Sequence, residues 1–361
     1  VRVLVVDDSV FFRKRIEEML KLDSRIRVIG TASDGAEAVA KAASLRPDVI
    51  TMDVEMPGMN GIDAVRQIMQ TTPTQVLMLS SLTHEGARIT LLALEAGAAD
   101  YLPKEASAWI SHRSELQKEL ASRVYALGRK PTPFPKTFSR SLDEVFASGS
   151  KNSSTGRVFT LRSEDTDPKP AAVRAVSKAV AHIAPIRPVV KTTIRAADPV
   201  RVVTPAFSIL VVGSSTGGPA ALQTILTQLP ANFPVPILLV QHMPRTFTQV
   251  FSERLNSICK IAVKEAENGD ELKPGRALLA PGGLQMMIDP HSRNRVSVLE
   301  GDTNLTYKPS VDISYASVAR VYGKQALAVI LSGMGADGCE GARLLKREGA
   351  HIWAQDEASC T

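Results

Sequence analysis

The stretch Val3-Leu-Val-Val-Asp7-Asp8 decides the fold of the first part of the chain. Four consecutive apolar residues, three of them β-branched, are typical of a strand buried on both faces of a parallel sheet. Two carboxylates directly after such a strand mark the carboxyl edge of the sheet, where the functional side chains of α/β proteins converge. The stretch therefore predicts a doubly wound parallel α/β fold built around this strand.

The same alternation continues outward from this strand to about residue 127. Phe12, Ile16, Met19 and Leu20 are spaced i, i+4, i+7, i+8, which predicts a helix after the first strand. Short β-branched runs predict the remaining strands. The strands expected are Val3–Val6, Arg27–Thr31, Val49–Met52, Val76–Leu79 and Ala99–Leu102. We assign residues 1–127 to a first α/β domain.

Composition changes sharply between residues 128 and 205. Nine of the chain's 22 prolines fall there, and residues 129–201 hold 14 Lys or Arg against 6 Asp or Glu, a net charge of +8. Because the whole chain carries +6, the remainder sums to −2. Low hydrophobicity with net charge predicts a disordered basic linker over 128–205. Val173, Val176, Val180 and Ile183 share one helical face, so either a docking helix or a transient turn lies within it.

The α/β pattern resumes after residue 205. Nearly continuous apolar runs again predict strands buried on both faces, with helical segments between them. These runs are Ser208–Val212, Ile237–Val240, Ala277–Ala280 and Ala328–Leu331. We assign 206–361 to a second doubly wound α/β domain, which makes the chain two parallel-sheet domains joined by a linker.

Composition excludes several classes of protein. At 361 residues with 44% hydrophobic and 22% charged residues, the chain is long enough for two globular domains. No apolar stretch approaches the roughly 18 residues of a membrane span. Cys259, Cys339 and Cys360 offer neither a disulfide framework nor metal-ligand spacing, which indicates a reduced, cytoplasmic protein. The basic excess lies in a Pro-rich stretch without a recognition motif, so we expect no nucleic-acid binding.

Acidic residues at strand ends carry the chemistry of the first domain. Asp53 follows the run Val49–Met52, so it should meet Asp7 and Asp8 at one edge of the sheet. Clustered carboxylates with oxygen-only ligands suit Mg²⁺. Ser80 and Lys104 follow two other strands and add a hydroxyl and a cation. This set suits phosphoryl transfer to a carboxylate nucleophile.

These residues make 1–127 resemble a response-regulator receiver domain, a flavodoxin-like fold. The resemblance implies phosphorylation at Asp53, with the conformational switch formed by Ser80, Tyr101 and Lys104. It also implies a Mg²⁺ site made by Asp7, Asp8, Asp53 and the carbonyl of Glu55. One departure is local: such domains usually have a proline after the lysine, whereas here Pro103 precedes Lys104 and Glu105 follows it.

The second domain carries the motif Gly213-Ser-Ser215-Thr-Gly-Gly218 between an apolar strand and a helix that begins near Pro219. The motif satisfies G-x-S-x-G, the nucleophile elbow, in its required strand–turn–helix context. A glycine-rich loop could instead cradle a phosphate, although this one lacks the lysine of a P-loop. Ser215 with Thr216 could also merely cap the helix.

Two further residues could complete a catalytic triad with Ser215. His242 follows the run Ile237–Gln241, and Asp337 lies in the glycine-rich turn Ser332-Gly-Met-Gly-Ala-Asp337-Gly after another strand. Both would reach the sheet edge that holds Ser215. A lone histidine or a lone turn aspartate is more often structural, but the three consistent positions together favour catalysis. Cys259 has no such surroundings, and burial is its expected fate.

The motifs Gly213–Gly218, Gln241-His-Met-Pro244 and Ser332–Gly338 resemble those of the CheB family of chemotaxis methylesterases, a Rossmann-like serine hydrolase fold. The resemblance extends to Ala280-Pro-Gly282, Pro309-Ser-Val-Asp312 and Gln355-Asp-Glu-Ala-Ser359. It implies Ser215 as nucleophile, His242 as base and Asp337 as orienting acid, with N–H groups near Thr216 and Met334 forming the oxyanion hole. Lys308 stands where the family often has arginine, and the family continues beyond Thr361, so we expect a truncated carboxyl end.

The resemblance implies a phosphorylation-activated protein-glutamate methylesterase that also deamidates glutamines of chemoreceptors. The implied partners are receptor cytoplasmic domains as substrate and the histidine kinase CheA as phosphodonor, with no cofactor for the esterase, no membrane insertion and a monomeric state. The receiver would cover the active site until phosphorylation shifts the population towards an open form. The alternative is a receiver-controlled module that binds a receptor or a phosphate without catalysis.

Overall fold

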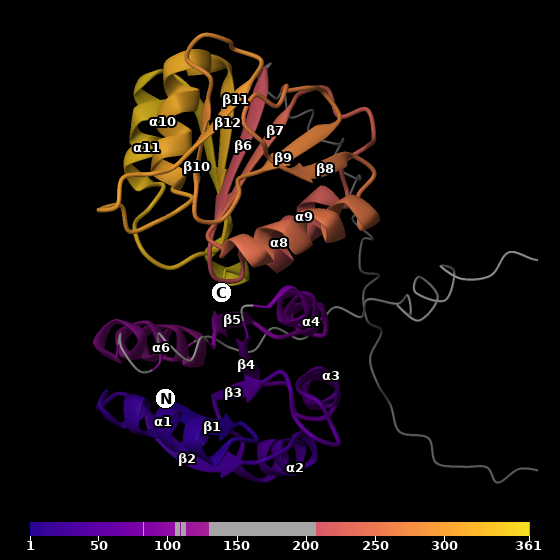
Figure 1. Ribbon diagram of the computed structural model, residues 1–361, viewed down its shortest axis with the longest axis vertical. Helices are drawn as coiled ribbons and strands as arrows, with labels where there is room; N and C mark the ends of the chain where they lie inside the picture. The colour runs from indigo at the N-terminus through magenta and orange to yellow at the C-terminus, as the bar shows by residue number, and fades with distance from the viewer. Residues whose placement is uncertain (82, 105–108, 110–112, 130–206, 361) are drawn as a thin grey trace, which may run out of the picture. The chain divides into compact units, whose positions relative to one another are not determined.

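The computed structural model describes the whole chain except residues 82, 105–108, 110–112, 130–206 and 361. The chain divides into two units, Val1–Lys136 with Pro205–Thr361, and Thr137–Thr204. The second unit lies outside the described residues, and with it most of the predicted linker and its possible docking helix. The strands of both parallel sheets, which Figure 1 labels, belong to the first unit.

The amino-terminal sheet has five parallel strands in the order β2-β1-β3-β4-β5. Its strands are β1 (Arg2–Val6), β2 (Arg27–Ala32), β3 (Val49–Asp53), β4 (Gln75–Ser80) and β5 (Asp100–Pro103). Its helices are α1 (Val10–Lys21), α2 (Gly35–Leu45), α3 (Gly61–Thr71), α4 (His84–Glu95) and α6 (Arg113–Gly128). All five strands expected from the sequence are present, with ends within one or two residues of the expected ones.

Helices cover both faces of this sheet, which explains its continuous apolar strands. Along β1, Leu4 and Val6 pack with residues of α2, α3 and α4, whereas Val3 and Val5 pack with α1 and α6. Four helices begin at a side-chain cap that satisfies a free backbone N–H group. These caps are Ser9 for α1, Asp34 for α2, Asn60 for α3 and Thr83 for α4.

The carboxyl-terminal sheet has six parallel strands in the order β13-β12-β6-β7-β9-β8. The strands are β6 (Ile209–Ser214), β7 (Ile237–Gln241), β8 (Ala262–Glu265), β9 (Arg276–Leu279), β12 (Ala326–Ile330) and β13 (His351–Ala354). The antiparallel pair β10 (Gln285–Ile288) and β11 (Val296–Leu299) forms a separate hairpin. The described helical elements are α8 (Gly218–Leu226), α9 (Arg245–Ile258), α10 (Val311–Tyr322), α11 (Cys339–Arg347) and the short 3₁₀ turns η2 (Gly323–Gln325) and η3 (Glu357–Ser359).

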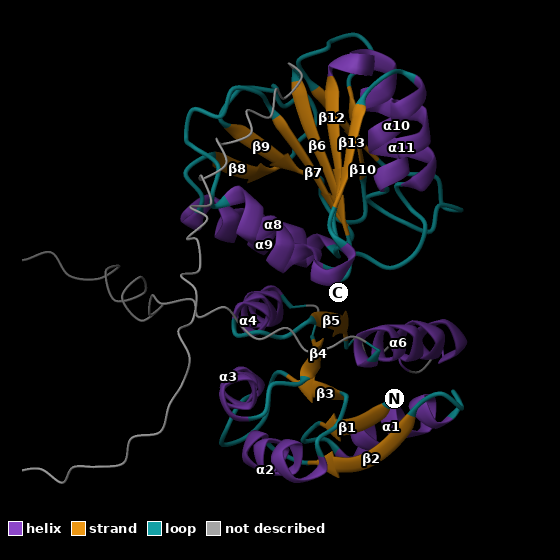
Figure 2. Cartoon of the chain, turned by 180° about the vertical axis from the view of Figure 1, so that it is seen from behind, coloured by secondary structure: helices purple, strands orange, loops and turns teal. Residues whose placement is uncertain are grey.

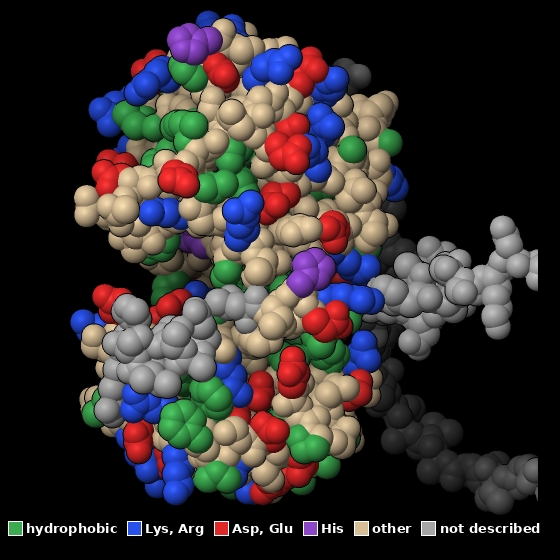
Figure 3. Space-filling view, viewed as in Figure 1, with side chains coloured by type: hydrophobic (Ala, Val, Ile, Leu, Met, Phe, Trp, Pro, Cys, Tyr) green, Lys and Arg blue, Asp and Glu red, His purple; other side chains and the backbone are tan. Residues whose placement is uncertain are grey.

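Two layers of helices enclose this second sheet, with α8 and α9 on one face and α10 and α11 on the other (Figure 2). The four strands expected from apolar runs are present. The edge strands β8 and β13 and the hairpin were not expected. β8, Ala-Val-Lys-Glu, ends in two charged residues, and β13, His-Ile-Trp-Ala, is a short edge strand that is mostly exposed. Acidic and basic side chains intermingle on the surface that Figure 3 displays, in keeping with the near-neutral charge of the folded parts.

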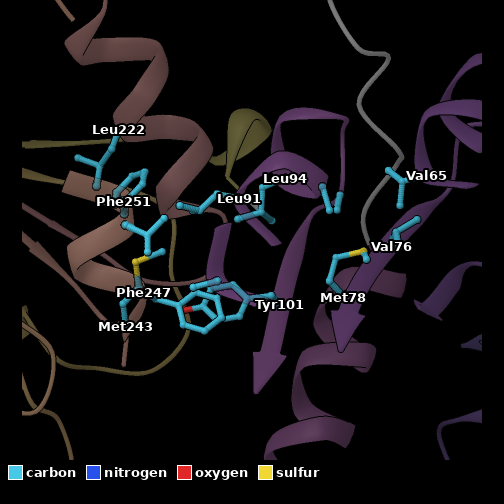
Figure 4. Packing of buried hydrophobic residues seen from close by; sticks show 14 of the residues in the cluster. Val65, Val76, Met78, Leu91, Leu94, Tyr101, Leu222, Met243, Phe247 and Phe251 are labelled. Atoms are coloured by element: carbon cyan, nitrogen blue, oxygen red, sulfur yellow. The ribbon is translucent and has the colours of Figure 1, made fainter. Parts of the chain in front are cut away.

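The two sheets share one apolar cluster, in which α4 packs against α9. The Tyr101 ring stacks on Phe247, with ring centroids 4.5 Å apart and planes 7° from parallel (Figure 4). Beside this cluster, the Arg254 guanidinium donates two hydrogen bonds to the Glu95 carboxylate, at 2.6 and 3.0 Å. Both charged side chains are largely buried, which makes the pair sensitive to loss of either partner. Among the described residues no helix is long and apolar enough to cross a membrane.

Candidate functional site

Strand β6 lies between β12 and β7, so the order in which strands are added reverses at β6. The loops that follow β6 and its neighbours therefore diverge and leave a crevice at the carboxyl ends of these strands. Ser215 follows β6, His242 follows β7 and Asp337 lies in the loop after β12. Ser215 and His242 line one cavity of about 960 Å³, together with Thr216 and Met334. The topology therefore brings the predicted triad and the predicted oxyanion residues to one place.

The turn that presents Ser215 is held by backbone contacts. The Ser215 N–H donates to the Ser332 carbonyl at 3.0 Å, and the Ser215 carbonyl accepts from Gln241 Nε2 at 2.9 Å. Gly217 has φ +72°, and a Cβ added to Gly218 would lie 2.2 Å from Gln241 Oε1. Since α8 has no side-chain cap, the possibility that Ser215 or Thr216 only caps this helix is wrong.

The imidazole of His242 is bound at one nitrogen. Its Nε2 lies 2.7 Å from Asp337 Oδ2. Its Nδ1 is buried and has no hydrogen-bond partner among the described residues. With Nε2–H donating to the carboxylate, Nδ1 is the nitrogen that can accept a proton from a neighbouring hydroxyl.

Asp337 is fixed at the amino terminus of α10. Its carboxylate accepts the N–H groups of Val311 (2.7 Å) and Asp312 (3.1 Å) and the hydroxyl of Ser310 (2.8 Å), besides the contact with His242. Burial alone raises the pKa of Asp337, but the hydrogen bond with His242 and those from α10 outweigh burial and bring the pKa to about 2. The carboxylate is therefore charged at neutral pH and can stabilise an imidazolium.

Thr216 and Met334 remain candidates for the oxyanion hole. Both line the same cavity as Ser215, from opposite loops. Within the described parts of the chain, neither backbone N–H donates a hydrogen bond to another residue. Unpaired N–H groups beside a nucleophile can stabilise the negative charge of a tetrahedral intermediate.

Sequence reasoning missed several residues that build this site. Gln241 forms two hydrogen bonds with the nucleophile turn: its Nε2 donates to the Ser215 carbonyl, and its amide oxygen accepts from the Ser214 hydroxyl at 2.6 Å. Ser310 was quoted only as part of a resembling motif, although a serine before an apolar helical run signals an N-cap. Tyr307 stacks on His242, with ring centroids 4.5 Å apart and planes 9° from parallel. No local pattern indicates Tyr307, because it lies in a loop far along the chain from His242.

The carboxyl edge of the first sheet gathers the predicted acids around one lysine. The Lys104 ammonium donates to Asp53 Oδ2 at 2.6 Å and to Asp7 Oδ2 at 2.7 Å. One carboxylate oxygen from each of Asp7, Asp8 and Asp53 lies within 4.8 Å of the others. Lys104 also lies over the ring of Phe12, 4.3 Å from its centroid.

Burial sets the charge balance of this cluster. It raises the pKa of Asp53 to about 6, against the opposing effect of Lys104, and it raises the pKa of Asp7 in the same way. Burial alone lowers the pKa of Lys104, but its contacts with Asp53 and Asp7 outweigh burial and raise it overall. A positive ligand between the acids would relieve this unfavourable burial of negative charge.

The other predicted receiver residues lie around this cluster rather than in it. The Ser80 hydroxyl donates to the Gly86 carbonyl at 3.1 Å, so it faces the start of α4. Tyr101 is buried against Phe247, with its ring away from the acids. The Glu55 side chain is exposed, in keeping with a prediction that involves only its carbonyl. Cys259, by contrast, has a pKa raised to about 11 by burial, which disfavours the thiolate of a nucleophile.

Comparison with known proteins identifies the families of the two halves of the chain. Residues 3–111 match the response regulator receiver domain, and residues 210–361 match the family described as CheB methylesterase. The whole chain is 50% identical to protein-glutamate methylesterase/protein-glutamine glutaminase 2 of Pseudomonas savastanoi pv. phaseolicola, covering 91% of that protein. It is also 50% identical over its whole length to protein-glutamate methylesterase/protein-glutamine glutaminase 1 of Pseudomonas aeruginosa, covering 90% of it.

A solved structure, the CheB methylesterase catalytic domain of Thermotoga maritima, is 40% identical over 43% of this chain and 83% of that chain, with a TM-score of 0.42. The full-length relatives carry the assignment, since they match both halves of the sequence in the same order. The chain therefore belongs to the CheB methylesterase family, with a response-regulator receiver domain at its amino terminus.

Proposed function

We propose that this chain hydrolyses γ-glutamyl methyl esters of chemoreceptors, with Ser215 as nucleophile, His242 as base and Asp337 as orienting acid. The observation that carries the proposal is the His242–Asp337 pair, which leaves the buried Nδ1 of His242 without a partner among the described residues, while His242 and Ser215 line one cavity. The names of the full-length relatives support the same activity and add glutamine deamidation.

In the first half of the reaction, His242 Nδ1 takes the hydroxyl proton as Ser215 Oγ attacks the ester carbonyl carbon. The negative oxygen of the tetrahedral intermediate accepts hydrogen bonds from the N–H groups of Thr216 and Met334. The bond from carbon to the methoxy oxygen then breaks, and the imidazolium returns its proton to give methanol.

In the second half, His242 removes a proton from water, and the resulting hydroxide attacks the glutamyl-serine ester. Collapse of the intermediate breaks the bond from carbon to Ser215 Oγ, and the imidazolium returns its proton to that oxygen. This step restores the Ser215 hydroxyl and leaves a glutamate side chain on the receptor. A glutamine side chain follows the same path with ammonia as the leaving group. Neither half of the reaction uses a cofactor in this mechanism, because the chain supplies the nucleophile, the base and the oxyanion donors.

The receiver residues fit a divalent cation and a phosphoryl group. Three clustered carboxylates, two of them buried, suit Mg²⁺, and we propose that Asp7, Asp8, Asp53 and the Glu55 carbonyl hold it. When bound, the cation neutralises oxygens of the incoming phosphoryl group. An Asp53 carboxylate oxygen attacks phosphorus as the nucleophile, and the bond from phosphorus to the imidazole nitrogen of the phosphorylated histidine kinase breaks, which leaves the donor histidine. Lys104, already bonded to the Asp53 carboxylate, can then move to the new phosphoryl oxygens.

We propose that phosphorylation acts on the contact between α4 and α9. The Tyr101–Phe247 stack and the Arg254–Glu95 ion pair favour the form in which the receiver restricts the active site. Drawing Lys104 and Ser80 towards a phosphoryl group would disturb β5 and the start of α4. Phosphorylation then shifts the population towards an open, active form.

The remaining assignments are also proposals. We place the receiver at 1–127, the linker at 128–205 and the catalytic domain at 206–361. The substrate is the cytoplasmic part of chemoreceptors, and the phosphodonor is the histidine kinase CheA. The protein then acts in the cytoplasm, where ATP supports that kinase, and we propose that it acts as a monomer.

Methanol release from a methylated receptor fragment tests the proposal. Wild type should release methanol faster with a small-molecule phosphodonor, Asp53→Asn should not respond to the donor, and Ser215→Ala should release none. Ser208→Ala, an exposed serine just before β6, is the matched control and should behave as wild type. Unchanged release by Ser215→Ala would overturn the triad. Receptor binding without release by any form would favour a binding module instead.

A further inference from the structure

Tyr307 lies where it can control the base of the triad. It belongs to the loop between β11 and α10, and its ring stacks face to face on His242 at 4.5 Å. Within the described part of the chain, one imidazole nitrogen is hydrogen-bonded to Asp337 and the other has no partner, so the carboxylate alone does not fix the plane of the ring. The aromatic face against the imidazole supplies the missing constraint.

The position of Tyr307 is itself fixed by the fold. Its carbonyl accepts from Gln285 Nε2 at 2.8 Å, and Gln285 Oε1 accepts from the Ser310 N–H at 2.8 Å. Between them, the Lys308 carbonyl accepts from the Gly283 N–H at 2.9 Å. Gln285 is almost fully buried at 3% exposure. The tyrosine is therefore anchored on both sides, and its backbone is tied to the segment that holds the acid of the triad.

At the other end of the ring, the Tyr307 hydroxyl lies against the loop that carries Met334. Gly335 has φ +101°, which favours glycine, and a Cβ added there would lie 2.8 Å from the hydroxyl oxygen, so this loop approaches the hydroxyl closely. The hydroxyl makes no hydrogen bond to any residue that the structure describes. The ring face, rather than the hydroxyl, is thus the part of Tyr307 with a defined partner.

We propose that Tyr307 is a positioning residue for His242, which holds the imidazole plane and stabilises the imidazolium through the π-face of its ring. This inference rests on the proposed triad. The charge on His242 appears when it takes the Ser215 proton and again when it activates water. An aromatic face attracts a cation by its quadrupole, and more strongly where water is excluded. The benefit arises only when the imidazole is charged, so it should appear in kcat rather than in substrate binding.

The test compares Tyr307→Leu with Tyr307→Phe in the full-length protein, activated by phosphodonor, with a methylated receptor fragment as substrate. Tyr307→Leu should lower kcat about fivefold, which corresponds to about 1 kcal/mol at 1.36 kcal/mol per tenfold. KM should stay within about twofold. Tyr307→Phe keeps the face and should retain kcat within about twofold. Tyr322→Leu, at the far end of α10, is the matched control.

Each other outcome overturns the proposal in a recognisable way. A raised KM with unchanged kcat would make Tyr307 a wall for the substrate, and equal losses in Phe and Leu would assign the effect to the hydroxyl. Unchanged kinetics in Tyr307→Leu, with Ser215→Ala inactive, would refute this inference and leave the triad intact. An active Ser215→Ala would instead refute the triad.

A second measurement avoids dependence on one variant. Protons above an aromatic face are shifted upfield, so the His242 ring protons should be upfield in wild type and in Tyr307→Phe. The shift should vanish in Tyr307→Leu, or in Tyr307→Met if leucine prevents folding. His242→Gln identifies the resonances among those of the chain's six histidines. Absence of the upfield shift in wild type would show that the stack does not form in solution.

Discussion

Replacement of Asp337 by asparagine should damage both the chemistry and the stability of the catalytic domain. The two carboxylate oxygens meet four donors: the Ser310 hydroxyl, the N–H groups of Val311 and Asp312, and His242. Asparagine has one acceptor oxygen and one NH₂ group, so at least one donor would face another donor. Leaving a buried donor unpaired costs about 1–3 kcal/mol.

The same hydrogen bonds stabilise the charged form of Asp337, which gives a second measure of their strength. The pKa of Asp337 is about 2 in the folded protein, below its ordinary value of 3.8. At 1.36 kcal/mol per pKa unit, this difference contributes about 2 kcal/mol to folding at neutral pH. Because the folded pKa is depressed, the contribution is complete above pH 4 and is lost as pH falls through the interval from 3.8 to about 2.

Urea denaturation of wild type and Asp337→Asn at several pH values checks the reasoning. The stability gap should be about 2–3 kcal/mol at pH 7, because the unpaired donor and the lowered pKa of Asp337 reflect the same hydrogen bonds and their costs are not summed. It should narrow by about 2 kcal/mol as pH falls from 5 towards 2. In parallel, methanol release should fall on the order of 10³–10⁴-fold, because the imidazole loses the acceptor that sets its tautomer. A gap independent of pH would refute the electrostatic part, and full activity would refute the role of the acid.

Three further predictions concern other parts of the molecule. Phe247→Leu should raise methanol release in the absence of phosphodonor. In a double-mutant cycle with Tyr101→Leu, the two substitutions should show a coupling free energy of about 0.5–1.5 kcal/mol, and additive effects would contradict a regulatory role of the stack. Gly218→Ala should reduce release at least tenfold, because its Cβ would overlap Gln241 Oε1, and activity equal to wild type would show that the nucleophile turn can relax. Lys104→Met should slow phosphorylation of the receiver, measured by radiolabelled phosphodonor, while unstimulated esterase activity stays at its wild-type level; unchanged labelling would exclude the lysine from the reaction.

The parallel strands were predicted best where burial on both faces of the sheet requires a continuous run of apolar residues. β1 and β6 are continuous apolar runs, and residues at their carboxyl ends were therefore placed at one edge of each sheet. β8 and β13 were missed because edge strands bury less and carry charged or exposed residues. Motif spacing gave the candidate residues, but only the three-dimensional arrangement shows what holds them.

Contacts between distant segments account for most of what could not be predicted. The Tyr307–His242 stack joins residues from two loops that share no local pattern, and the Tyr101–Phe247 stack joins two domains. Which imidazole nitrogen faces the acid also depends on the path of the chain after β7 and β12. These features follow from packing, which periodicity and motif spacing do not encode.

The use of His242 Nε2 by the acid has a consequence for how the base moves. The proton acceptor is then Nδ1, which lies farther from the Cβ–Cγ axis than Nε2 does. Rotation of the ring about the Cβ–Cγ bond therefore displaces Nδ1 more than it displaces the nitrogen bonded to Asp337. The reaction should consequently be sensitive to rotation of the imidazole, which the Asp337 contact and the Tyr307 stack both restrict. Alkylating inhibitors directed at this histidine should modify Nδ1, a position that peptide mass spectrometry with isomer standards can distinguish.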